Sequence, residues 1–223
     1  MRQLVIPALA VVVAVVIWRS TSEEPSPDAI PACTWRVGTG TDTRQGQNYD
    51  EVAPETPVRL SFSCGEARYL YVFSHSAEDG TLLLWPSPLL QCDLAQPLPA
   101  GHSVLPGSLE GRELAWTTRS GIHGVTTYVT VASREKVAEL EALAPRLRLW
   151  SNTVFPDKAM LVTKPSNSAD VAGPPYSAPP AAVLERAVAC TASETLANGP
   201  LHADPAQPGV WFGTWKVVEK KPR

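Results

Sequence analysis

The sequence has little excess charge of either sign and lacks the short motifs of several enzyme classes. Its 223 residues carry 19 Lys and Arg against 22 Asp and Glu, which gives a net charge of -3. This balance does not indicate a nucleic-acid binder, whose affinity depends on a basic surface. Neither glycine-rich nucleotide motif, G-x-x-x-x-G-K-[ST] or G-x-G-x-x-G, occurs. A G-x-S-x-G nucleophile elbow is also missing, because Ser108 has no glycine at either required position.

Histidine is scarce and is not grouped with other catalytic residue types. The four histidines are scattered along the chain, and no CxxC or HxxxH spacing indicates a metal site. His75 lies between two serines and before Asp79, but neighbours on a strand point to opposite faces, so Ser74 and His75 would diverge. No carboxylate stands alone in an apolar strand, where burial would raise its pKa for acid–base work. We therefore predict a protein that is not an enzyme and has no metal or cofactor.

The four cysteines favour disulfides over a metal site. They are Cys33, Cys64, Cys92 and Cys190. An even number outside the cytosol favours two bridges. Of the three pairings that four cysteines allow, we expect Cys33–Cys64, between neighbouring strands, and Cys92–Cys190, between a loop and a helix.

The N-terminus predicts a membrane anchor. Residues 1–18 contain Arg2 followed by an unbroken apolar run, LVIPALAVVVAVVIW. Since no small-x-small cleavage site follows the run directly, an uncleaved signal anchor is favoured over a cleaved signal peptide and secretion. The positive-inside rule places the remaining chain outside the cytoplasm, in the periplasm of a bacterium. Residues 19–31 read as a Pro/Ser-rich tether, 32–219 as the folded domain and 220–223 as a basic tail.

Three strands are predicted between Val58 and Trp85. The first alternates strictly, with Val58, Leu60, Phe62 and Cys64 on the buried face. The second, 68–74, is apolar on both faces and is therefore expected at the centre of a sheet, covered on both sides. Asp79-Gly80 predicts a tight turn into the third strand, which ends before Pro86. We expect all three to be consecutive antiparallel neighbours.

Further strands and two helices complete the predicted domain. Strands are expected at 33–37, 102–105, 113–118, 125–132 and 209–218, with 113–118 and 125–132 as a hairpin and the first strand paired with the last. A helix capped by Ser133 should bury Val137, Leu140, Ala144 and Leu147 until Pro145 ends or kinks it. A second helix is predicted over 181–192. The fold class is therefore mainly β with minor α: an antiparallel β-sandwich-like domain with one or two short packed helices, preceded by the N-terminal anchor helix.

Four segments carry a family resemblance. They are YLYVF with its acidic-Gly turn and aromatic-Pro end within 58–88, PLPAGHSVLPG at 97–107, TTYVTVASREKVAELEAL at 126–143 and GVWFGTWKVVE at 209–219. The chain thereby resembles the bacterial "domain of unknown function 4384" family, in particular its myxobacterial-type members. The resemblance implies an extracytoplasmic β-rich domain on signalling or membrane-anchored chains. It implies no catalytic residues.

These observations favour a non-catalytic domain that binds a protein partner or ligand, or senses a condition, in the cell envelope. Two alternatives stay open: an envelope hydrolase whose site is assembled from distant loops, and a structural or assembly subunit. The seven tryptophans allow a core-packing interpretation and, less favoured, an exposed aromatic binding surface.

Overall fold

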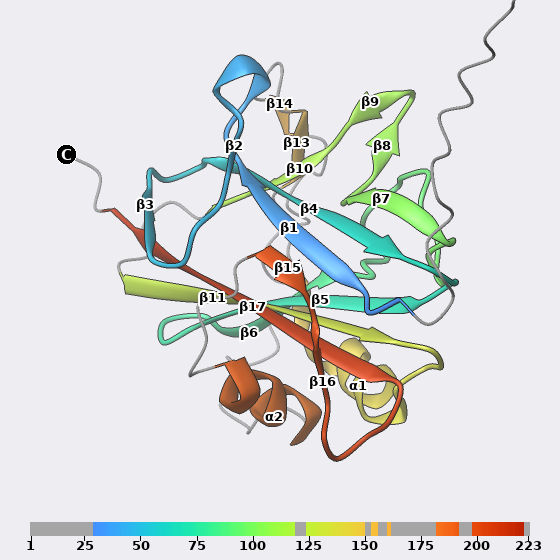
Figure 1. Ribbon diagram of the computed structural model, residues 1–223. Coiled ribbons are helices and arrows are strands. Elements are labelled where there is room, and N and C mark those ends of the chain that lie inside the picture. Colours follow the sequence, from blue (N-terminus) through green and yellow to red (C-terminus); the bar gives the residue numbers. More distant parts are fainter. Residues whose placement is uncertain are drawn as a thin grey trace, which may run out of the picture.

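Two β-sheets pack face to face, and two helices cover the outer face of one sheet (Figure 1). The structure, a computed structural model, describes residues 29–118, 124–149, 153–155, 160–161, 182–191 and 198–220. The predicted anchor at 1–18 and most of the tether at 19–31 lie outside the described residues. The mainly β prediction is confirmed, and the sheets pack as in a sandwich.

The first sheet, sheet A, is entirely antiparallel in the described residues. Its strands lie in the order β14 (Met160–Leu161), β13 (Thr153–Phe155), β10 (Ala115–Thr117), β4 (Pro57–Cys64), β1 (Ala32–Val37) and β15 (Asn198–Pro200), with β2 (Arg44–Gln45) beside β1 and β7 (Gly101–Leu105) beside β4. A separate ribbon joins β8 (Ser108–Leu109) to β9 (Arg112–Glu113), and η1 (Gly40–Asp42) precedes β2.

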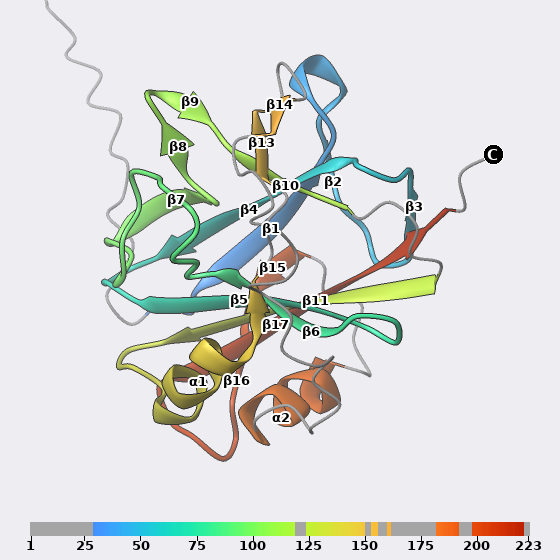
Figure 2. The ribbon, with the colours of Figure 1, turned by 180° about the vertical axis from the view of Figure 1, so that it is seen from behind.

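The second sheet, sheet B, is mixed at its margins. Its order is β12 (Arg148–Leu149), β6 (Gly80–Trp85), β5 (Tyr69–Ser76), β11 (Gly124–Ser133), β17 (Val210–Glu219) and β16 (His202–Ala203), with β3 (Asp50–Val52) beside β17. The pairs β12–β6 and β17–β3 are parallel. The reverse view shows β6 and β5 above α1 (Ala138–Leu143) and α2 (Ala182–Thr191) (Figure 2). A short 3-10 helix, η2 (Ala144–Arg146), follows α1 directly.

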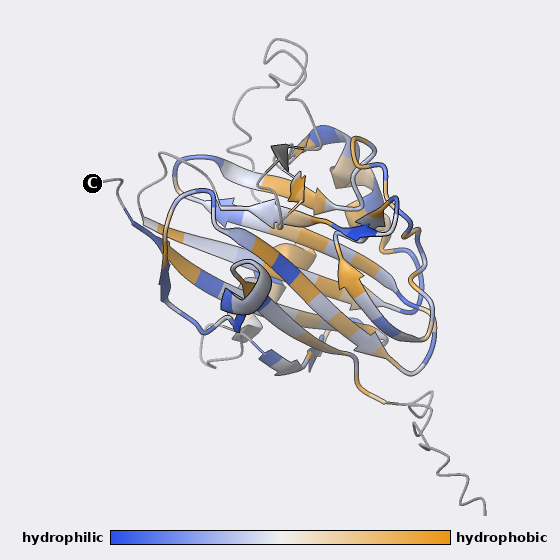
Figure 3. Cartoon of the chain, turned by 90° about the horizontal axis from the view of Figure 1, so that it is seen from above, coloured by the Kyte–Doolittle hydropathy of each residue, from blue (hydrophilic) through white to orange (hydrophobic). Residues whose placement is uncertain are grey.

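Alternation along β4 builds the core between the sheets. Val58, Leu60, Phe62 and Cys64 are all buried on its inner face, as predicted. The opposite face is less open than the pattern indicates, because Arg59 and Ser61 are buried as well. The Arg59 guanidinium is held by Glu113 and donates to Thr43 Oγ1 at 3.0 Å. Figure 3 views the molecule from above, and hydrophobic and hydrophilic residues alternate along the strands of sheet A in this view.

β5 lies at the centre of sheet B, between β6 and β11, as its two apolar faces predict. Leu70 and Val72 belong to the core between the sheets, whereas Tyr71 and Phe73 belong to the core under the helices. Each of these four side chains is at most 1% exposed. Burial on both sides is what distinguishes this strand from β4.

Three predicted strand pairings are wrong. β4 and β5 are not neighbours, because the chain crosses from sheet A to sheet B between them. For the same reason β10 and β11 form no hairpin. The first and last strands, β1 and β17, lie in opposite sheets rather than side by side. Side-chain patterns report which face is buried, and they do not report which strand supplies the neighbouring backbone.

An aromatic cluster joins β1 to β17 across the core instead. Trp35 stacks on Trp215 with ring centroids 5.1 Å apart, and Tyr128 stacks on Trp215 at 5.1 Å. Trp116 lies 6.2 Å from Trp35. Of the five tryptophans in the described residues, only Trp211 is not buried. The core-packing interpretation of tryptophan thus holds for most of these side chains.

The helices lie where the sequence predicts, with different caps. Ser133 ends β11 and donates its hydroxyl to Glu135 O at 2.6 Å, while Val137 is the N-cap of α1. The strand continues to Ser133 because that residue pairs with both Tyr69 and Val210. Buried apolar side chains of α1, the turn after it and α2 face sheet B: Val137, Leu140, Leu143, Leu147, Val183, Leu184 and Ala187.

The loop between β5 and β6 is a three-residue hairpin loop. Ser76 pairs with Gly80, so Ala77, Glu78 and Asp79 form the turn. Gly80 takes a φ of 66°, whereas Asp79 does not adopt a positive φ. The tight turn predicted at Asp79-Gly80 requires a positive φ at both residues, so it is wrong in detail, although the hairpin is present.

Candidate functional site

A pocket opens between the start of β5, the end of β6, the following loop and the N-terminal end of α1. Its volume is about 290 Å³. The pocket is lined by Tyr69, Trp85, Pro86, Ser87, Leu90, Leu94, Ala95, Gln96, Lys136 and Glu141. This volume lies near the lower end of the range for small-molecule sites, about 300–1,000 Å³.

The loop wall of the pocket is held against β5 by a side-chain amide. β6 stops pairing at Trp85, opposite Val72, because Pro86 has no N–H for the ladder. Beyond that point Gln96 replaces the strand: its Oε1 accepts from Leu70 N at 2.9 Å, and its Nε2 donates to Leu70 O at 2.5 Å. Both hydrogen-bonding groups of the Gln96 amide are thereby engaged, which gives the loop a defined position along the strand.

The loop is anchored a second time two residues farther along. Leu98 N donates to Arg68 O at 2.8 Å, and Arg68 N donates to Leu98 O at 3.0 Å. Leu90 and Leu94 pack partly against the core between the sheets. Because the wall is fixed by backbone hydrogen bonds and by apolar contacts, the pocket is preformed rather than a gap between mobile chains.

A buried tyrosine positions the carboxylate at the pocket rim. Tyr71 Oη donates to Glu141 Oε1 at 2.6 Å and accepts from Val137 N at 3.3 Å. Burial, reinforced by the hydrogen bond to Glu141, raises the pKa of the Tyr71 phenol above its usual range. The phenol therefore stays protonated and remains a donor to Glu141 at neutral pH. The same hydrogen bonds tie the start of α1 to β5.

Lys136 places a positive charge beside this carboxylate. Its Nζ lies 3.9 Å from Glu141 Oε2 and 6.0 Å from the centroid of the Tyr69 ring. The side chains of Lys136 and Glu141 are 62% and 42% exposed. A separation of 3.9 Å is too long for a hydrogen bond, so the ion pair leaves hydrogen-bonding capacity on both groups. The rim is electrically balanced and accessible.

The remaining walls are mainly apolar and aromatic, with Ser87 as a polar member. Trp85 is 3% exposed and supplies its ring beside Pro86, Leu90 and Leu94. Within the described part of the chain its buried indole Nε1 has no hydrogen-bond partner. The pocket therefore combines an apolar surface with one acid and one base at its rim. This combination suits binding of a small group with an apolar part and a charged part.

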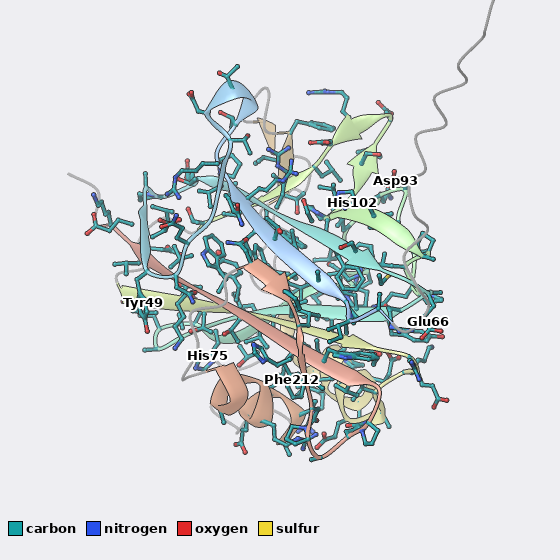
Figure 4. All side chains as sticks on the ribbon, in the orientation of Figure 1. Tyr49, Glu66, His75, Asp93, His102 and Phe212 are labelled. Atoms are coloured by element: carbon teal, nitrogen blue, oxygen red, sulfur yellow. The ribbon has the colours of Figure 1, made fainter. Side chains whose placement is uncertain are left out.

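A charged cluster closes the core at the same end of sheet B. Glu66 forms ion pairs with Arg68 and, at 3.0 Å, with Arg134. Arg68 Cζ lies 4.9 Å from the centroid of the Trp211 ring, and Arg134 Cζ lies 5.9 Å from it. The hydrogen bond from Arg68 and the nearby positive charges hold the pKa of Glu66 below its usual value. Figure 4 shows Glu66 at the end of the sheets opposite Tyr49.

The histidines in the described residues come from separate elements. Figure 4 shows His75 toward the helices and His102 on sheet A. Ser74 is 3% exposed whereas His75 is exposed, so the two side chains diverge as the strand period predicts. His75 Nδ1 instead contacts Thr81 Oγ1 at 3.0 Å. Among the described residues, no group of three or more His, Cys, Asp or Glu side chains could hold a metal ion.

The predicted disulfides are not formed in the structure. Cys33, Cys64 and Cys92 are free thiols. Cys33 and Cys64 lie on the inner faces of neighbouring strands, but Cys33 is paired with Phe62. Cys64 Sγ contacts Pro99 O at 3.5 Å, and Cys92, in the pocket loop, contacts Leu94 O at 3.5 Å. Cys190 belongs to α2, with its side chain outside the described residues, so bridging in the oxidised protein stays a prediction.

Sequence patterns did not identify the pocket. The proline after Trp85 marks the end of a strand, which is the only local signal near it. Gln96 and Lys136 resemble ordinary surface residues until the fold brings them to β5. The pairing of Ser133 with Tyr69 is what places the segment containing Lys136 beside the pocket loop.

Comparison of the chain with protein-family models, with curated proteins and with solved structures gives no match. Within the described residues, no helix combines the length and the hydropathy needed to span a membrane.

Proposed function

We propose that this protein is a non-catalytic binding domain of a bacterial envelope protein. In this proposal residues 1–18 anchor the chain in the inner membrane, and the β-rich domain binds a ligand or partner in the periplasm. The observation that carries the proposal is the preformed pocket between the 86–96 loop and α1, with a volume of about 290 Å³.

Two features of the pocket support binding. Its walls are held in place by Gln96 and Tyr71, whose hydrogen bonds link the loop and the helix to β5. A ligand therefore meets a surface that has already lost its conformational freedom, which lowers the cost of association. Apolar and aromatic side chains beside a few charged groups are the usual composition of such sites.

The test is site-specific photocrosslinking in bacterial cells that produce the full chain. A photoreactive residue replaces Ser87, which lines the pocket, or Thr41, an exposed control on η1. The expected result is a discrete adduct from Ser87 alone, with a small ligand or with a protein, detected by mass spectrometry of the chain purified from the membrane fraction. The same adducts from both positions, or none from Ser87, would contradict the proposal and favour a structural subunit.

Compartment is tested in the same cells. Protease added to intact cells should leave the chain whole, and protease added to spheroplasts should digest the domain at 32–219. Protection in spheroplasts would place the domain in the cytoplasm and would refute this part of the proposal.

A further inference from the structure

We infer that the pocket binds a free α-amino acid with an apolar side chain. This inference rests on the proposed binding function and names the ligand class. Three properties of the pocket lead to it: an accessible pair of opposite charges, an apolar wall beside that pair, and a volume suited to a ligand of amino-acid size.

The charge pair complements a zwitterion. Lys136 Nζ and Glu141 Oε2 are 3.9 Å apart, so neither group saturates the other. An α-amino acid carries an ammonium and a carboxylate on one carbon. Its carboxylate would accept from Lys136 while its ammonium would donate to Glu141. A ligand with a single charge would instead be attracted by one rim group and repelled by the other.

The acidic half of this pair is oriented before any ligand arrives. Tyr71 donates to Glu141 Oε1, so Oε2 is the oxygen left for a ligand ammonium. Tyr71 is fully buried and stays protonated because burial raises its pKa. Tyr71 is therefore a positioning residue for the proposed ammonium site, and it does not itself contact the ligand.

The apolar wall selects the side chain. Trp85, Pro86, Leu90 and Leu94 line the pocket beside the charged rim, and Tyr69 completes the aromatic surface. A ligand whose α-carbon lies between Lys136 and Glu141 would direct its side chain against these groups. Burial of a branched or aromatic side chain would then add hydrophobic stabilisation that glycine or alanine cannot provide.

Isothermal titration calorimetry of the purified full chain tests the inference. The probes are L-leucine and L-phenylalanine, with glycine, N-acetyl-L-leucine and L-leucinamide as comparisons. N-acetyl-L-leucine lacks the ammonium, and L-leucinamide lacks the carboxylate. We expect saturable binding of leucine or phenylalanine and binding that is about 10- to 100-fold weaker for each of the three comparisons, because hydrogen bonds between charged groups are lost or the apolar contact is missing.

Matched variants locate the site. Lys136→Met and Glu141→Gln should each weaken leucine binding about 10-fold or more. Glu141→Gln keeps an oxygen that can accept from Tyr71, so the helix should stay attached to β5. Glu139→Gln, on the same helix but outside the pocket lining, and Lys216→Met, on β17, are the controls and should bind as the parent does.

Two titration results would each overturn the inference: no saturable binding of leucine or phenylalanine at millimolar concentration, or equal binding of leucine and N-acetyl-L-leucine by the parent protein. Binding unchanged in both pocket variants would also overturn it. A Ser87 crosslink that persists in cells despite such a result would leave the proposed binding function standing with a different ligand. Loss of the crosslink would remove the binding function as well.

Discussion

Gly46→Ala should destabilise the fold because of one fully buried tryptophan. A Cβ at position 46 would lie 2.9 Å from Cζ2 and 3.0 Å from Cε2 of Trp215. The indole cannot move away easily, since it is stacked against Trp35 and Tyr128 and donates from Nε1 to Gln47 O at 2.9 Å. The loop must shift instead.

The expected loss follows from opposing contributions. Overpacking a core typically costs about 1–3 kcal/mol. Weakening the hydrogen bond from Trp215 would add about 0.5–1.5 kcal/mol. Against this, replacing glycine with alanine reduces the freedom of the unfolded chain, which stabilises by about 0.4–1 kcal/mol. We therefore expect a net loss of about 0.5–4 kcal/mol in the free energy of unfolding, measured by urea denaturation of the purified protein.

A second glycine provides the control. At Gly213 an added Cβ would lie only 2.6 Å from Leu201, but the atom concerned is the terminal Cδ2 of a flexible side chain. Gly213→Ala should therefore cost less than Gly46→Ala, although its contact is shorter.

A double-mutant cycle attributes the effect to the indole. Trp215→Phe removes the ring atoms nearest Gly46, so the double variant Gly46→Ala/Trp215→Phe should lose at least about 0.5 kcal/mol less than the sum of the single losses. Additive losses, or a neutral Gly46→Ala, would refute the reasoning.

Three further predictions concern the helix layer, the thiols and a surface carboxylate. Leu184→Ala should lower the free energy of unfolding by about 2–5 kcal/mol, because the Leu184 side chain is 2% exposed and packs between α2 and sheet B. A loss below about 1 kcal/mol in urea titrations would contradict that packing. In the reduced native protein Cys92 should react with iodoacetamide at pH 8 before Cys33, because Cys33 is buried and burial raises the pKa of its thiol to about 12. Mass spectrometry of labelled peptides shows the order, and faster labelling of Cys33 than of Cys92 would contradict this reasoning. Burial opposes ionisation of Asp93, but hydrogen bonds from Ser108 outweigh this effect, so the pKa of Asp93 is lowered in the folded protein. The Asp93 carboxylate therefore stabilises the fold above a pH of about 4, and this contribution is lost as the pH falls through the folded-state pKa. Asp93→Asn should therefore lower Tm at pH 7 and converge with the parent at pH 2–3, and an undiminished difference in acid would contradict the assignment.

Local patterns predicted those features that depend only on the residues of one segment, such as which face is buried and where a strand ends. The double-sided apolar sequence of 68–74 indicated a central strand, and the predicted helix over 181–192 matches α2 at Ala182–Thr191. Proline marked the end of β6 at Trp85. In each case the signal and the structure lie within the same few residues, so the inference needed no knowledge of the partner.

Strand partners and the pocket were beyond such patterns. Trp35 and Trp215 are 180 positions apart in the chain, and alternation cannot say whether such strands pair edge to edge or face each other across a core. No pattern near Gln96 in the sequence predicts that its side-chain amide hydrogen-bonds to the Leu70 backbone in place of a neighbouring strand. Its role depends on the place where β6 stops and on the path by which the chain returns to Arg68.

The order of residues alone thus accounts for the mainly β composition, the buried faces and the ends of several elements, because these depend on period, turn chemistry and proline. The crossing of the chain between the sheets, the aromatic stack that joins them and the meeting of Lys136, Glu141 and Trp85 around one pocket arise from packing. Such contacts join residues that are distant in sequence, and the energy that selects them is that of a complete core rather than of any one segment.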